Sequence, residues 1–161
     1  MSKKIIPLLL FVLLSAAAFS QTATGMKKIA PFQMTLTNGK PYNFSQLTPG
    51  PVVLMYFSPD CDHCQDFTKA LLKNYTVISN KQLIMVTFQP MEMVKQFEKT
   101  YNLASYPNVK LGTEGTSYLV QKYYQIRSFP YIVMYDKTGK LVKTFEGEQP
   151  YSEIFKALKS F

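Results

Sequence analysis

Three apolar runs of strand length stand out along the chain and predict a β-sheet. "VVLMYF" (52–57), "QLIMVTF" (82–88) and "YIVMYD" (131–136) are rich in β-branched and aromatic residues and contain few polar ones. Half-exposed strands alternate between apolar and polar residues, whereas strands covered on both faces do not. We therefore expect all three runs to be strands, the first two being buried on both faces.

Apolar residues that recur at every third or fourth position predict the helices. From Cys61 to about Tyr75, the recurring residues are Cys64, Phe67 and Leu71, which would share one helical face. A proline such as Pro90 suits the first turn of a helix. Three further helices are predicted. The first follows Pro90 and turns Met91, Val94, Phe97 and Tyr101 inward. The second, at 117–124, would be capped by Thr116 and turn Tyr118, Leu119 and Tyr123 inward, and the third lies at 151–160.

Turn signals divide the remaining chain into hairpins and a loop. Asn38-Gly39 separates residues 33–37 from 40–44, and "DKTGK" (136–140) leads from the third apolar run into 141–145, both patterns being typical of hairpins. "SYPNVKLGTEG" (105–115) contains a proline and two glycines, and we expect a loop there. Strands joined by helices, with an antiparallel edge, predict an α/β sandwich with helices on both faces of a mixed sheet.

The first 20 residues have the layout of a secretory signal peptide. Two lysines precede an apolar run at 5–14, and small residues follow. The run, even extended to Phe19, is about 15 residues and falls short of the roughly 20 that span a bilayer, although an uncleaved anchor is the alternative. We expect cleavage near Ser20 and Gln21, a periplasmic or secreted protein, and no stable membrane insertion afterwards. The domains would be a signal peptide (1–20), a flexible mature N-terminus (21–29) and one folded domain (30–161).

Charge excludes one class of partner. The chain has 18 Lys and Arg against 10 Asp and Glu, a formal net charge of +8. The lysines are scattered and are not interleaved with aromatic residues, so we interpret them as a solvated surface and expect no nucleic-acid partner. We expect a monomer.

Both cysteines of the chain lie in "SPDCDHC", at the junction of the first apolar run and the helix that follows. An exported protein meets oxidising conditions in which disulfides persist, yet a C-x-x-C disulfide closes a loop too small to stabilise the fold much. A redox role is therefore the better interpretation. Free N–H groups and the dipole at the helix start favour a thiolate at Cys61, and Cys64 lies one turn later as a resolving thiol.

Other uses of the cysteines fit the sequence less well. A structural zinc site takes about four Cys or His ligands, but the chain has two cysteines and only one histidine, His63. Covalent haem attachment requires C-x-x-C-H, and Gln65 occupies the histidine position. We therefore expect neither a metal nor a cofactor.

Four segments together resemble the thioredoxin superfamily, and most closely its exported TlpA/ResA-like members. They are "APFQMTLTNGKPYNFSQL", "VVLMYFSPDCDHC", "YYQIRSFPYIVMYD" and "DKTGKLV", and the resemblance runs from about Ala30 to Phe161. It implies a thioredoxin-like three-layer α/β/α sandwich with a mixed sheet and an N-terminal β-hairpin. It also implies a thiol–disulfide oxidoreductase that exchanges with thiol or disulfide protein substrates and is recharged by an upstream redox partner.

The resemblance assigns roles around the cysteines. It implies a cis bond between Phe129 and Pro130, set beside Cys61, where a substrate chain pairs with the Phe129 backbone. We expect Phe129 to be a surface contact for substrates. His63 would stabilise the Cys61 thiolate, whereas Asp60 and Asp62 would oppose it. We expect a reduction potential of roughly −120 to −270 mV, between thioredoxin and DsbA.

The sequence also departs from the family pattern. Pro59-Asp60 stands where thioredoxins usually have a tryptophan before the first cysteine, and Met55 occupies the position of a buried acid that helps to deprotonate the second thiol. We expect slow disulfide release, or another base. His63, Asp60 and Asp66 are the candidates.

Two alternative functions share this fold. In a peroxiredoxin-like thiol peroxidase, Ser58 would fit the P-x-x-x-(S/T)-x-x-C pattern, but Leu54 occupies the proline position, and the one arginine, Arg127, is far along the chain. A non-catalytic thioredoxin-fold module would hold a partner through the cysteines without turnover.

Overall fold

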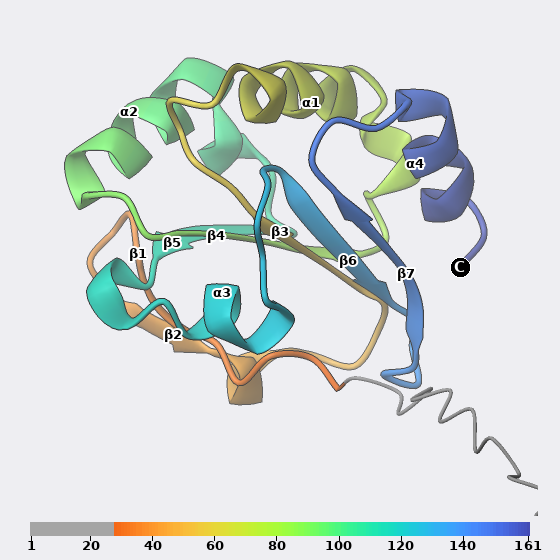
Figure 1. The fold of residues 1–161 in the computed structure, drawn as a ribbon, viewed down its shortest axis with the longest axis horizontal. Helices are drawn as coiled ribbons and strands as arrows, with labels where there is room; N and C mark the ends of the chain where they lie inside the picture. The colour runs from red at the N-terminus through yellow and green to blue at the C-terminus, as the bar shows by residue number, and fades with distance from the viewer. Residues whose placement is uncertain (1–27) are drawn as a thin grey trace, which may run out of the picture.

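The computed structural model describes residues 28–161, which form a seven-stranded sheet and its covering helices (Figure 1). The strands are β1 (Gln33–Leu36), β2 (Pro41–Asn43), β3 (Val52–Tyr56), β4 (Gln82–Thr87), β5 (Val109–Thr113), β6 (Tyr131–Tyr135) and β7 (Leu141–Glu146). The helices are α1 (Asp62–Lys73), α2 (Met91–Tyr101), α3 (Leu119–Tyr124) and α4 (Tyr151–Leu158). The signal-peptide prediction (1–20) and residues 21–27 of the expected flexible segment lie outside the described residues.

The centre of the sheet is built from the three apolar runs. The strand order is β2-β1-β5-β4-β3-β6-β7, with β3 parallel to β4 and antiparallel to β6. All residues of β3 and β6 are buried, which confirms the predicted strands. Tyr56 pairs with Val86 on one side and with Tyr131 on the other. The carboxyl ends of β3 and β4 therefore meet the amino end of β6 at one end of the sheet.

Helices cover both faces of the sheet, as the sequence predicts. Figure 1 shows α1, α2 and α4 on one side and α3 on the other. The first core contains Phe67 and Leu71 of α1, Val94 and Phe97 of α2, and Ile154 and Leu158 of α4, whereas the second contains Val120 and Tyr124 of α3. The fold is thus a three-layer α/β/α sandwich. Within residues 28–161 no helix has both the length and the apolar content that crossing a membrane requires.

The two outer strands belong to the predicted hairpins. β2 pairs antiparallel with β1, has only three residues and begins with Pro41. β7 pairs antiparallel with β6 and exposes Lys143, Thr144 and Glu146. A register shift interrupts the β6–β7 ladder beside Tyr135. Both hairpin predictions are confirmed.

The predicted loop at 105–115 is wrong, because its middle forms β5. This strand lies between β4, to which it is parallel, and β1, to which it is antiparallel. Its Gly112 has no room for a side chain, since a Cβ atom would lie 2.5 Å from the Thr35 carbonyl oxygen. Glycine in a strand commonly marks such a close approach of another backbone. The glycine that suggested a loop therefore lets β1 join the sheet.

Replacing Gly112 by alanine should destabilise the domain by about 1–3 kcal/mol, because overpacking a tight site typically costs this much. The added Cβ must push β1 away from β5 or shift both strands. Urea unfolding followed by circular dichroism measures the loss. Gly115→Ala is the matched control, since its Cβ meets no atom within 4 Å and only its φ of +57° is unfavourable. Equal losses in the two variants would contradict the packing argument.

The helix predicted at 117–124 begins later and turns a different face inward. α3 starts at Leu119 after Tyr118, whose φ is +48°, and Thr116 is exposed and does not cap it. Val120 and Tyr124 are buried, whereas Tyr118, Leu119 and Tyr123 are half-buried. The N-terminus of α3 is held by Glu114, whose carboxylate accepts hydrogen bonds from the Val120 N–H (2.9 Å) and the Tyr56 hydroxyl (2.8 Å). Because Glu114 is also bonded to Tyr56, on a strand far away in the sequence, the position at which α3 begins depends on that distant contact.

Buried tyrosine hydroxyls connect the second core to the beginning of the described chain. The Tyr124 and Tyr135 hydroxyls lie 2.8 Å apart, Tyr124 accepts from the Ala30 N–H, and Tyr135 donates to the Lys28 carbonyl. Burial is the main cause that raises the pKa of Tyr56 and Tyr124, and it raises the pKa of Tyr135 to about 12. These hydroxyls stay neutral in the folded protein at ordinary pH.

Candidate active site

Cys61 and Cys64 lie where β3 passes into α1. Cys61 is the N-cap residue of α1, with an extended backbone (φ −86°, ψ 117°), and its carbonyl accepts hydrogen bonds from the N–H groups of Cys64 and Gln65, both at 3.0 Å. The N-cap side chain makes no capping hydrogen bond. The first N–H groups of α1 are thus left to favour negative charge near the Cys61 sulfur.

The two thiols differ in exposure. Both cysteines are free; Cys61 is partly exposed, whereas Cys64 is fully buried. Burial raises the pKa of the Cys64 thiol, and its hydrogen bond with Cys61 raises it further, while a hydrogen bond with the Ser58 backbone acts in the opposite direction. Within this pair, Cys61 is accessible to another molecule and Cys64 is accessible to Cys61.

The Phe129–Pro130 loop lies beside the start of α1. The bond between these residues is cis, which confirms the prediction. Because Tyr56 pairs with Tyr131, the loop that precedes β6 reaches the segment following β3. Pro130 and His63 line the same small cavity, and the Pro130 carbonyl accepts a hydrogen bond from the Gly147 N–H at 3.0 Å. The structure therefore brings this loop together with the cysteine helix.

Phe129 belongs to an aromatic cluster that the sequence did not reveal. Its half-buried ring lies 5.8 Å from the Tyr56 ring and 5.9 Å from the Phe88 ring, measured between centroids. Phe88 lies in turn 5.7 Å from Tyr118. The predicted contact residue is therefore one of several half-buried rings at the carboxyl end of β4. An aromatic residue following a buried strand was the available signal for Phe88.

A polar network shapes the segment that leads to Cys61. The buried Ser58 hydroxyl donates a hydrogen bond to the Asp60 carboxylate and accepts one at 2.9 Å from the Gln89 side-chain amide. The charge of Asp60 contributes to the raised pKa of Cys64. Asp60 therefore lies near the second thiol, but its charge disfavours the thiolate, and the choice of a base among His63, Asp60 and Asp66 stays a prediction. Sequence reasoning missed Gln89, which only the parallel pairing of β3 and β4 brings into place.

A family comparison matches most of this chain. The model of a thioredoxin-like domain matches residues 46–161. The chain belongs to this thioredoxin-like family. No curated protein sequence matches it.

Solved structures share the thioredoxin-like fold at low sequence identity. A secreted Mycobacterium tuberculosis disulfide oxidoreductase homologous to E. coli DsbE has a TM-score of 0.68 and 17% identity, and the match covers 81% of this chain and 96% of that one. The thioredoxin domain of a Bacteroides vulgatus thiol-disulfide oxidoreductase has a TM-score of 0.64 and 20% identity, with 83% and 97% covered. The peroxidoxin BcpB of Mycobacterium tuberculosis has a TM-score of 0.65 and 15% identity, with 83% and 94% covered.

Many thioredoxins have a buried acid at the position that Met55 occupies here, so this domain has no acidic side chain at that position. Met55 is fully buried in the same core as Cys64. Of the candidate bases, His63 is 56% exposed with its Nε2 3.8 Å from the Glu148 carboxylate, and Asp66 pairs with Lys69 at 2.9 Å. Of the three candidates, Asp60 is the one whose charge reaches Cys64, and that charge raises the pKa of the thiol, which does not favour its deprotonation.

The residues considered for other chemistries are also placed by the structure. Within residues 28–161, no three His, Cys, Asp or Glu side chains gather as a metal site. The Ser58 hydroxyl is engaged by Asp60 and Gln89. Leu54 is fully buried, and Arg127 is exposed in the loop before Phe129, with its N–H donating to Glu146.

Proposed function

We propose that this thioredoxin-like domain is a thiol–disulfide oxidoreductase that exchanges dithiol and disulfide with protein substrates. The observation that carries the proposal is the asymmetry of the cysteine pair. Cys61 is partly exposed at the uncapped start of α1, and Cys64 is buried one turn later in contact with it. An accessible thiol that reacts first and a shielded thiol that reacts second are what a mixed-disulfide mechanism requires.

The exchange moves two electrons without a cofactor. In the reducing direction, the Cys61 thiolate attacks one sulfur of a substrate disulfide, a new S–S bond forms, and the second substrate sulfur leaves as a thiolate that takes up a proton. The Cys64 thiolate then attacks the Cys61 sulfur, which forms the Cys61–Cys64 disulfide and releases the remaining substrate thiol. The substrate gains two electrons and two protons, and the enzyme loses them. The reverse sequence oxidises a dithiol.

The loop before β6 would hold the substrate. We assign the Phe129 backbone to pairing with an extended substrate segment, in the manner of strand addition, with the Phe129 ring as an apolar contact. Its support is the position of Phe129 and Pro130 at the amino end of β6, beside the start of α1. His63, with Glu148 as its partner, would adjust the charge around the thiolate.

Export and partners belong to the same proposal. The layout of residues 1–20 supports a periplasmic or secreted enzyme. Such an enzyme would act as a monomer and be returned to its starting redox state by an upstream partner.

Two single substitutions, one at each cysteine, test the mechanism. Reduced Cys64→Ser should accumulate mixed disulfides with a substrate protein that contains a disulfide, because Cys61 can attack that disulfide but the resolving sulfur is gone. Cys61→Ser should accumulate none, because Cys64 is buried. Non-reducing gel electrophoresis and intact-mass spectrometry measure the adducts, which dithiothreitol should release. Adducts on Cys61→Ser in place of Cys64→Ser would reverse the two roles.

Two assays separate the alternative functions. Catalytic insulin reduction by the wild type, lost in both variants, distinguishes an enzyme from a module that binds without turnover. Coupled peroxide consumption far above that of Cys64→Ser would favour the peroxiredoxin-like alternative. The thioredoxin-like proposal expects turnover in the first assay and no such excess in the second.

A further inference from the structure

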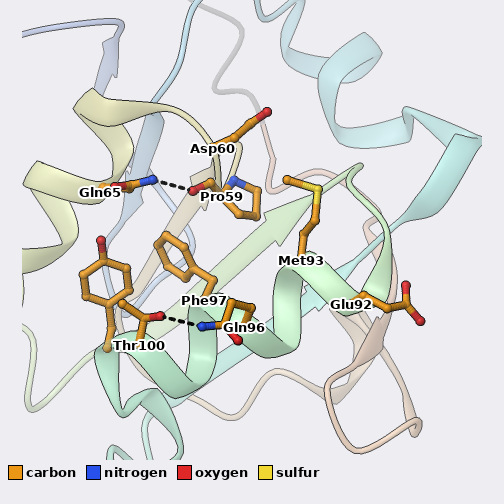
Figure 2. Close-up of a pocket in the computed structure, with 9 residues that line it drawn as sticks. Pro59, Asp60, Gln65, Glu92, Met93, Gln96, Phe97 and Thr100 are labelled. Carbon is orange, nitrogen blue, oxygen red and sulfur yellow. Dashed lines mark hydrogen bonds between the residues drawn. The ribbon is translucent and has the colours of Figure 1, made fainter.

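A groove lies next to the cysteines, between the start of α1 and the outer face of α2. Its volume is about 420 Å³. Figure 2 shows Pro59 and Gln65 on one side and the α2 residues Met93, Gln96 and Phe97 on the other. Nothing in the mechanism above uses this groove.

The floor of the groove is apolar, and its rim carries hydrogen-bond acceptors. Phe97 is 4% exposed and Pro59 is buried, so their rings form the base, with Met93 beside them. Figure 2 shows Asp60 and Glu92 at the margin, with the Glu92 carboxylate directed outward from the groove. An apolar floor below acidic groups fits a long aliphatic side chain that ends in a positive charge, because such a side chain places its stem on apolar surface and its head in water.

No lysine or arginine lines the groove, although the chain carries a formal net charge of +8. Glu92 forms no salt bridge within the described part of the chain, and it is exposed in the first turn of α2. A neighbouring cation is Lys69, which lies close enough to the Tyr101 hydroxyl to oppose the burial-driven rise in its pKa. Lys69 is already paired with Asp66. The groove is thus an acidic site on a basic protein.

We propose that this groove binds a lysine or arginine side chain of the substrate polypeptide, close in sequence to the cysteine that reacts with Cys61. The inference rests on the proposed function and adds a substrate class, proteins whose reactive cysteine has a basic residue nearby. Glu92 and Asp60 are the residues that select the charge, and Phe97, Met93 and Pro59 receive the aliphatic stem.

The length of the groove limits how far the basic residue can lie from the substrate cysteine. Asp60, on the rim, is the residue before Cys61. The groove follows α2 from Glu92 to Tyr101, about 13 Å at roughly 1.5 Å per helical residue. An extended substrate chain advances roughly 3.3 Å per residue, so the groove holds about four residues. Because Asp60 on the rim adjoins Cys61, we place the basic residue within about four positions of the substrate cysteine.

Short peptides that differ at one position test the inference. Each carries one cysteine as a mixed disulfide with thionitrobenzoate, and a lysine, norleucine or glutamate is placed two, three or four positions to either side. Norleucine keeps the aliphatic stem and removes the charge. At its best position, the lysine peptide should react about two- to fivefold faster than the norleucine peptide, as expected for an exposed ion pair, and the glutamate peptide should be slowest. Absorbance of the released thionitrobenzoate gives the rates.

A matched pair of variants locates the effect. Glu92→Gln should abolish most of the preference for lysine, whereas Glu153→Gln should retain it. Both glutamates are exposed in the first turn of a helix, and both substitutions remove one negative charge. Loss of the preference in both variants, or in neither, would overturn the assignment to the groove.

Failure of the inference and failure of the proposed function give different results. If all peptides exchange at equal rates, the groove does not select charge, but the oxidoreductase proposal stands. If no peptide exchanges, the oxidoreductase proposal fails. Fluorescence anisotropy of labelled peptides with serine in place of cysteine then decides the binding itself, because tighter binding of the lysine peptide supports the groove and equal binding overturns it.

Discussion

Resolution of the mixed disulfide by Cys64 should accelerate about tenfold for each pH unit between roughly pH 6 and 9, because only the thiolate attacks and its fraction grows tenfold per unit below the pKa. Burial raises the pKa of Cys64 above its ordinary value, so the thiolate stays a minor species over this whole range. The expected change over three pH units is about a thousandfold.

Stopped-flow reaction with dithiobis(nitrobenzoate) measures this step. The first release of thionitrobenzoate reports attack by Cys61 and depends on reagent concentration. The second release reports attack by Cys64 on the Cys61 adduct and does not. Cys64→Ser should show the first release only. A second rate that levels off near neutral pH would mean that a base inside the site ionises Cys64, and Asp60→Asn would then identify whether Asp60 is that base.

Alkaline pH should destabilise the domain steeply through its buried tyrosines. An ordinary tyrosine has a pKa near 10, whereas the pKa values of Tyr56, Tyr124 and Tyr135 are raised in the fold. Below pH 10 both states keep these protons, so the stability is complete. Above it the unfolded chain loses protons that the native protein keeps, and the free energy of unfolding falls. The fall approaches about 1.4 kcal/mol per pH unit for each group, and for the three groups together it amounts to about 3 kcal/mol between roughly pH 10 and 11.

Urea unfolding at a series of pH values measures this loss, and phenolate absorbance shows whether the buried hydroxyls ionise only on unfolding. Tyr135→Phe should reduce the fall in the free energy of unfolding with pH by the contribution of one tyrosine, since Tyr135 is buried and its pKa is raised to about 12. Stability that stays level through this pH range would contradict the burial of the three hydroxyls.

The sequence predicted the part of the site that depends on neighbouring residues. An apolar run followed by helical periodicity located the junction of β3 and α1, and C-x-x-C spacing placed Cys64 one turn behind Cys61. The hairpins followed from Asn38-Gly39 and from "DKTGK". In each case the pattern and the structure involve residues that are close along the chain, so local physical preferences are sufficient.

Features that depend on contacts between residues far apart in the sequence could not be predicted from the sequence. Gly112 suggested a loop, but glycine is needed there because a side chain would collide with the Thr35 carbonyl on another strand. The sequence does not show that this carbonyl is near. The start of α3 depends on Glu114, whose carboxylate is oriented by Tyr56. The acidic groove joins the segment before α1 to the face of α2. A single sequence contains each of these residues but gives no sign that they meet.

The outer strands of the sheet suit a protein proposed to exchange disulfides with other polypeptides. An open, regular strand edge recruits other polypeptides into continuous cross-chain sheets, and natural proteins block such edges with prolines, charges and irregular pairing. Here one edge is only three residues long and starts with Pro41, and the other exposes Lys143 next to an interrupted ladder. If the proposed exchange at Cys61 holds, a polypeptide bound there would meet no long, regular outer strand on which to begin aggregating.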